Sequence, residues 1–163
     1  MKYLLFLSIL LSIIHTELIS PINLDTLSKI HVLFEWEQEP YALDYNIQVS
    51  KTSMFDDTVI DTNSYSLVYI DKENLNWDNE YYWRVRPIFL NGIIGPWIDE
   101  NSFSIFNEVL ISDIEYSEVD ANNNNLIIFG DSYREKSIVF DRNGQEIWNA
   151  GSDFSINELN DYG

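Results

Sequence analysis

The chain has 163 residues, of which 45% are hydrophobic and 15% aromatic, enough to bury the core of one ordinary domain. Its formal net charge of −18 would repel a phosphate backbone, so nucleic acid is not expected as a partner, and we interpret the acidity as solubilising rather than cation-binding. Cysteine is absent, which excludes disulfides, thiolate metal sites and a cysteine nucleophile.

The first predicted element is an apolar leader. Residues Tyr3 to Ile14 are apolar apart from two serines and follow Lys2, a pattern typical of a secretory signal peptide and short for a bilayer span. We assign residues 1–16 to this signal peptide and expect a secreted, cell-surface or periplasmic protein. Small residues that would define a cleavage site are scarce, so an uncleaved N-terminal anchor is the alternative. No membrane contact is expected beyond this leader.

Alternating apolar and polar residues predict β-strands from Pro21 onward. The strands predicted from this period of two cover residues 30–36, 45–50, 64–70, 81–86 and 97–106. An Asn91-Gly92 pair predicts a hairpin turn before the last of them, because both residue types accept positive φ.

A tyrosine corner is the most specific signal. Leu75 lies six residues before Tyr81, which opens an aromatic strand, and a phenol at that place in a β-sandwich bonds back to the preceding backbone. The same alternation separates an inward set, Tyr81, Trp83 and Val85, from an outward set, Tyr82, Arg84 and Arg86.

Five features in order resemble a fibronectin type III domain of the bacterial extracellular kind. They are Trp36, the run Tyr45 to Ser50 with Phe55 after it, Leu75 before Tyr81, the strand Tyr81-Tyr82-Trp83-Arg84-Val85-Arg86, and Gly95-Pro96-Trp97 before Phe103. The resemblance covers residues 21–106. It implies an all-β, immunoglobulin-like sandwich, which we expect to have seven antiparallel strands around Trp36, Tyr45, Ile47, Tyr81, Trp83 and Val85. Trp77-Asp78-Asn79 departs from the Pro-Gly-Thr type of turn usual in that family.

Residues 107–163 change in character and predict a short, incomplete β-meander. Residues 126–129 and 137–140 are expected strands, and Asp141 to Gly144 is an expected hairpin turn leading to 145–148. The pattern resembles the opening blade of arylsulfotransferase-like β-propeller proteins. A lone blade leaves its edges open, so we expect a truncated propeller or a tail that pairs with the sandwich or another chain.

No catalytic residue, metal ligand or cofactor is assigned. His31 is expected to be a solvated strand residue, and no Gly-x-Ser-x-Gly elbow occurs. Asp141 to Gly144 is expected to be a turn rather than a calcium loop. The acidic side chains that we expect at solvated strand edges, rather than as catalytic pairs, are Glu35, Glu37, Glu39, Asp56, Asp57, Asp99 and Glu100.

Outward aromatic residues suggest the one candidate contact surface. Tyr82 and Trp97 beside Arg84 and Arg86 have the composition of a carbohydrate or protein contact, and arginine stacking on tyrosine within the sheet is the alternative. Specific binding residues are not assigned. We expect a secreted, non-catalytic spacer or a module that binds extracellular protein or carbohydrate. The alternatives are the N-terminal fragment of a secreted arylsulfotransferase-like enzyme, with its catalytic part outside this chain, and a carbohydrate-binding module of a degradative enzyme.

Overall fold

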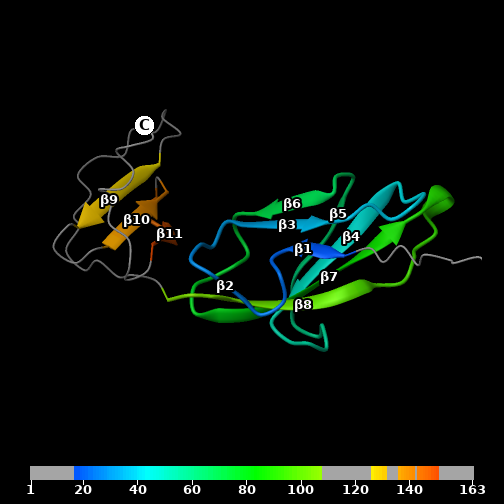
Figure 1. Ribbon diagram of the computed structural model, residues 1–163, viewed down its shortest axis with the longest axis horizontal. Helices are drawn as coiled ribbons and strands as arrows, with labels where there is room; N and C mark the ends of the chain where they lie inside the picture. The colour runs from blue at the N-terminus through cyan, green and yellow to red at the C-terminus, as the bar shows by residue number, and fades with distance from the viewer. Residues whose placement is uncertain (1–16, 108–125, 132–135, 142, 151–163) are drawn as a thin grey trace, which may run out of the picture.

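The computed structural model describes residues 17–107, 126–131, 136–141 and 143–150. Two β-sheets pack face to face, and a third, small sheet lies at one end of them (Figure 1). The smaller sheet of the sandwich has the order β1-β3-β6, formed by Leu18–Ser20, Val32–Trp36 and Val68–Asp71. The larger has the order β2-β8-β7-β4-β5, formed by Asp25–Leu27, Ile98–Ile105, Asn79–Ile88, Asp44–Ser50 and Thr58–Ser64. The expected all-β, immunoglobulin-like sandwich is therefore confirmed.

The number and direction of strands differ from the expected seven antiparallel strands. The chain forms β1 in one sheet, crosses at Pro21, and forms β2 in the other, so eight strands build the sandwich. β2 runs parallel to β8, pairing Asp25 with Phe103 and Leu27 with Ile105. Proline has no N–H to donate, which suits it to the point where the chain leaves one ladder for another.

Two further boundaries correct the sequence-based strands. Residues 64–70 were expected to form one strand, but a turn separates Ser64, the last residue of β5, from β6. The sequence alternation did not predict β5. β5 lies at a sheet edge and carries the polar sequence Thr-Val-Ile-Asp-Thr-Asn-Ser, so its apolar alternation is weak. The expected turn at Asn91-Gly92 is present, with φ of 62° and 74°, inside the short 3-10 turn η1 (Leu90–Gly92).

The core contains all six residues that the alternation placed there: Trp36, Tyr45, Ile47, Tyr81, Trp83 and Val85 are buried. Phe34 of β3 packs edge-on against Trp83 and Phe103, with ring centroids 5.2 and 5.8 Å apart, and so joins the two sheets. Aromatic pairs in this geometry add to the free energy gained from burying their area.

The tyrosine corner is formed. The backbone N–H of Asn76 donates to the Tyr81 hydroxyl at 3.0 Å, and the neighbouring Leu75 is buried. In the turn that departs from the family pattern, Asp78 takes the left-handed conformation with φ of 56°. Tyr45 provides a second, unpredicted bond of this type, because its hydroxyl accepts the N–H of Glu39 at 2.7 Å.

The third sheet is an antiparallel meander of β9 (Ile127–Asp131), β10 (Lys136–Phe140) and β11 (Glu146–Asn149). The expected hairpin between β10 and β11 is present, and the Asp141 carboxylate accepts the N–H groups of Asn143 and Gln145 at 2.8 and 2.9 Å. Such a local bond is how aspartate stabilises a turn.

The meander pairs with the sandwich, one of the arrangements expected for it. Ile30 N–H donates to the Ile147 carbonyl at 3.1 Å, and Asn149 N–H donates to the Ser28 carbonyl at 3.0 Å. The Ile147 side chain belongs to the sandwich core. The domain boundary at residue 106 remains a prediction, although these bonds cross it.

Among the described residues, no helix is long and apolar enough to span a bilayer.

Candidate functional site on the outer face of the larger sheet

The outward residues of β7 and β4 lie side by side on the solvent face of the larger sheet. Register pairs Arg84 with Gln48 and Arg86 with Asn46, so each arginine lies opposite an amide side chain. Cross-strand partners on one sheet face are close enough to interact directly. The sequence alternation, which pointed these arginines outward, placed them correctly.

Aromatic rings enclose the arginines. The Arg84 guanidinium carbon lies 3.7 Å from the ring centre of Phe55 and 4.1 Å from that of Trp97. The Arg86 guanidinium carbon lies 4.2 Å from the Trp97 ring. Guanidinium groups stack on aromatic faces through cation–π attraction, which strengthens as water is excluded.

A hydrogen-bonded row connects the same arginines to β5. Arg84 donates to Gln48 Oε1 through Nε and Nη2 at 3.1 and 2.8 Å, and Arg86 Nε donates to Asn46 Oδ1 at 3.0 Å. Both amides then donate to the Asp61 carboxylate at 2.8 Å. A network satisfied in this way fixes the rotamers of its members.

The charge of the face follows from this packing. Burial lowers the pKa of Arg84, while the carboxylates of Glu100 and Asp61 oppose that shift. The guanidinium stays protonated at neutral pH, because the ordinary pKa of arginine lies far above neutrality. At the neighbouring outward position, the Glu80 carboxylate raises the pKa of Tyr82.

Arginine stacking within the sheet, the alternative to a contact surface, is therefore present, but its aromatic partners are Trp97 and Phe55 rather than a tyrosine. Trp97 was identified from the sequence and Phe55 was not. Phe55 lies in the turn between β4 and β5 with a φ of 56°, outside any strand alternation. In the sequence, Phe55 was noted only as part of the fibronectin-like motif after Ser50, not as a member of the contact surface. Tyr82 is half-buried on the same face.

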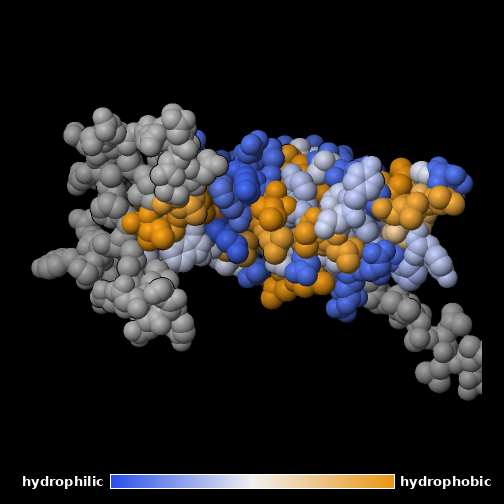
Figure 2. Space-filling view, turned by 90° about the horizontal axis from the view of Figure 1, so that it is seen from above, coloured by the Kyte–Doolittle hydropathy of each residue, from blue (hydrophilic) through white to orange (hydrophobic). Residues whose placement is uncertain are grey.

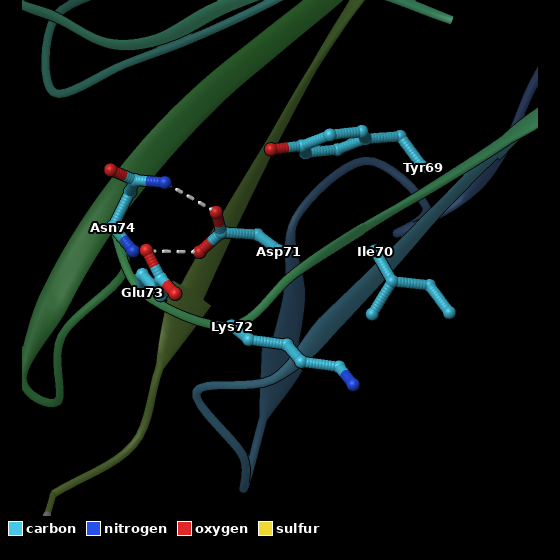
Figure 3. A pocket seen from close by; sticks show the side chains of 6 residues that line it. All are labelled: Tyr69, Ile70, Asp71, Lys72, Glu73 and Asn74. Atoms are coloured by element: carbon cyan, nitrogen blue, oxygen red, sulfur yellow. Dashed lines mark hydrogen bonds between the residues drawn. The ribbon is translucent and has the colours of Figure 1, made fainter.

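A pocket of about 220 Å³ lies elsewhere, at the end of β6 (Figure 3). The buried Asp71 carboxylate there is turned toward Asn74 and accepts its backbone N–H at 3.0 Å and its Nδ2 at 2.7 Å. These are the bonds of an aspartate that stabilises its own turn. Both carboxylate oxygens thus accept hydrogen bonds within the turn that leads to the tyrosine corner, rather than serving the open space of the pocket.

The acidic residues singled out in the sequence lie in separate places. Glu35 is on β3, Asp56 is in the turn after β4 and accepts a hydrogen bond from the Thr52 hydroxyl, and Asp99 is on β8. In the part of the chain that the structure describes, no three histidine or acidic side chains are grouped as metal ligands would be. His31, just before β3, is half-buried.

Comparisons with known proteins give similarity at the level of fold. No protein-family model matches the chain, and no curated protein matches it. A solved structure of an Fn3-like protein from Clostridium thermocellum has 23% identity and a TM-score of 0.42, and the match covers 56% of this chain and 94% of that one. An alpha-L-rhamnosidase from Dictyoglumus thermophilum has 14% identity and a TM-score of 0.47, over 77% of this chain and only 16% of that one.

Both TM-scores are low, so the fold assignment rests on the strand order and the tyrosine corner described above. The comparisons give the arylsulfotransferase-like blade no support.

Proposed function

We propose that this chain is an exported, non-catalytic spacer module that holds its two ends apart in a fixed orientation. The observation that carries the proposal is the attachment of β11 to residues 28–30 by backbone hydrogen bonds. An antiparallel β-bridge with a shared apolar core resists bending more than a flexible linker does. Export is inferred from the leader at residues 1–16.

The geometry of the ends supports the proposal. Glu17 accepts the N–H of Glu37 near the loop that precedes β4, whereas β8 carries the chain away from that end to Phe106. Figure 1 shows β9, β10 and β11 at the opposite end of the sandwich from η1. A module that receives the chain at one end and delivers it at the other is suited to separating what it connects.

The test is a distance measurement on the full chain. Because the protein has no cysteine, Leu90→Cys and Leu126→Cys introduce two spin-label sites, both at exposed residues at opposite ends. A single narrow distance distribution is expected. Ile147→Asp removes the apolar contact that joins the sheets and is expected to broaden the distribution, whereas Tyr65→Asp at an exposed position leaves it unchanged. A broad distribution in the unaltered background would overturn the spacer proposal.

A second function, binding of extracellular protein or carbohydrate, is favoured by one observation. The stacked arginines and aromatics are held rigid by their own network, and a rigid aromatic surface loses little entropy when it binds. Screening of the purified chain on a glycan array tests it. A ligand whose signal disappears in Tyr82→Ala but persists in Tyr65→Ala supports binding at this face. The absence of any signal on the array would argue against carbohydrate binding and in favour of the spacer role.

A further inference from the structure

The loops at the end of the sandwich remote from the meander expose apolar side chains. Tyr41 and Leu43 precede β4, and Leu90, Ile93 and Ile94 follow β7. We call these five residues the apolar tip. Figure 2 shows apolar side chains gathered at that end of the molecule, at the right of the view.

Backbone bonds bring the two loops together. Leu43 N–H donates to the Ile88 carbonyl at 2.9 Å, and Phe89 N–H donates to the Ile93 carbonyl at 2.7 Å. Ile88 also bridges to Ile94. The members of the tip therefore come from adjacent backbone segments and form one surface rather than scattered exposed residues. Contiguous exposed apolar surface on a folded protein marks an interaction site.

The tip also has unusual local chemistry. Pro87 to Ile98 is the longest run without a charged residue between residues 17 and 107, although 22% of the chain is charged. Tyr41 is 90% exposed with a φ of 68°, a conformation unfavourable for a bulky side chain. Backbone strain that presents an aromatic ring to solvent is typical of a functional surface.

We propose that the apolar tip contacts a lipid bilayer. Leu90, at 66% exposed, and Tyr41 protrude from the surface rather than line a groove, which suits insertion into a fluid layer. Leucine and isoleucine side chains partition favourably into the acyl-chain region, and tyrosine is enriched at the boundary between lipid and water.

The place of the chain's apolar leader identifies the bilayer as the occupant. The described chain begins at Glu17, whose carbonyl is bonded to Glu37 N–H at the base of the loop that carries Tyr41. Residues 3–14, which are mostly apolar, therefore join the sandwich at its tip end. If the leader is retained as the uncleaved N-terminal anchor, the alternative given above, the membrane that receives it lies beside the tip. The proposal extends the sequence-based expectation, which confined membrane contact to the leader, and it does not depend on the spacer role.

The negative charge of the protein determines which lipid headgroups the tip can approach. The tip has no basic residue of its own, Glu37 and Glu39 flank it, and the chain carries a net charge of −18. Anionic headgroups would be repelled. The expected surface is therefore a bilayer of electrically neutral phospholipid.

The test uses the full chain with a single environment-sensitive fluorophore, placed by Leu90→Cys at the tip or by Met54→Cys as the matched control. Met54 is 84% exposed and lies in the turn between β4 and β5, after the end of β4 that is remote from the tip. The vesicles are made of phosphatidylcholine and contain a quencher in their acyl chains. On adding them, the emission maximum of the probe at position 90 is expected to move to shorter wavelength and its intensity to fall. The Met54 probe is expected to do neither.

Adding Ile93→Asp and Ile94→Asp to the Leu90 probe should abolish the shift without changing the thermal unfolding temperature, because both side chains are exposed. Anionic lipid in the vesicles should reduce the emission shift of the probe at position 90 in the otherwise unaltered chain. The proposal fails if the Leu90 probe stays as it is in buffer, or if both probes are quenched equally. It also fails if the Leu90 shift arises without vesicles and grows with protein concentration, since the tip would then bind a second copy.

Discussion

The Trp77 indole Nε1 donates to the backbone carbonyl of Glu146 at 2.9 Å, a hydrogen bond between residues 69 positions apart. It connects the turn within the tyrosine corner, between Asn76 and Tyr81, to β11. Ile147, the next residue in β11, packs in the sandwich core. The junction therefore combines a polar contact with an apolar one, and each can be altered separately.

Trp77→Phe keeps the ring and removes the donor, leaving the Glu146 carbonyl without this bond. The free energy of unfolding is expected to fall by about 1–2 kcal/mol, the cost of a lost hydrogen bond with a partly buried acceptor. Hydrogen exchange should become faster in β10 and β11 before it changes in β4 and β7. Trp97→Phe, which keeps an aromatic face beneath the arginines, is the control. Equal acceleration in both variants would contradict a role specific to the junction.

Tyr81→Phe tests the tyrosine corner. The hydroxyl accepts the Asn76 N–H, and without it this donor loses its partner, so we expect a loss of about 1–1.5 kcal/mol in chemical denaturation. Tyr82→Phe on the same strand is the matched control, because its side chain points outward, and its effect should stay within about 0.5 kcal/mol. The corner has no stabilising role if the two variants unfold at the same denaturant concentration.

Alkaline pH should destabilise the fold through its buried tyrosines. Burial raises the pKa of Tyr81 and of Tyr45 above the ordinary value of 10.0. The folded state thus holds these protons more tightly than the unfolded state. Their contribution to stability is fully present below about pH 10 and is lost as the pH rises through the folded pKa. Tyr81→Phe should reduce the slope of stability against pH above about pH 10, measured by denaturation at a series of pH values. An unchanged slope would mean that Tyr81 does not contribute.

Trp83→Ala should lower the free energy of unfolding by about 3–5 kcal/mol, because truncating a fully buried aromatic residue leaves a cavity. Trp83 is 0% exposed, packs on Phe34 and donates its Nε1 to the Pro21 carbonyl at 3.1 Å. The control is Tyr65→Ala at an exposed position, with an expected change within about 0.5 kcal/mol. A loss below about 1 kcal/mol in the tryptophan variant would contradict its core position.

Residues 107–163, expressed alone, are expected not to fold. The apolar face of β11 is covered by the sandwich, and so short a meander buries too little surface to offset its chain entropy. Circular dichroism of the isolated segment should show no cooperative unfolding.

Limited proteolysis of the full chain bears on the boundary itself. The sequence predicts cleavage near residues 106–108, which would leave a resistant sandwich. The bonds from Phe106 N–H to Leu27 and from Asn149 Nδ2 to Asn107 instead favour protection of 106 and 107. Equal resistance throughout the C-terminal segment would mean that this segment is packed along its whole length.

Residues whose position depends on local pattern were predictable from the sequence. Period-two alternation assigned Trp83 and Arg84 to opposite faces, and the spacing of Leu75 from Tyr81 located the corner. Contacts between distant segments left no such signal. Neither the parallel pairing of β2 with β8 nor the burial of Ile147 could be read from spacing, because each depends on a partner far along the chain. The same holds for Phe55 above Arg84, since a turn residue has no alternation to reveal its direction.

The pairing of β2 with β8 has a consequence for the order in which the fold is completed during synthesis. Thr26 and Ser104, which face each other across this pair, are 78 positions apart. Strand β2 leaves the ribosome early and must wait for its partner until almost the entire sandwich has been made. We expect this pair to form after the folding transition state, since distant contacts carry the largest loop-closure cost. Thr26→Gly should then speed unfolding and leave the folding rate unchanged in stopped-flow experiments. Slower folding in that variant would place the pair in the nucleus.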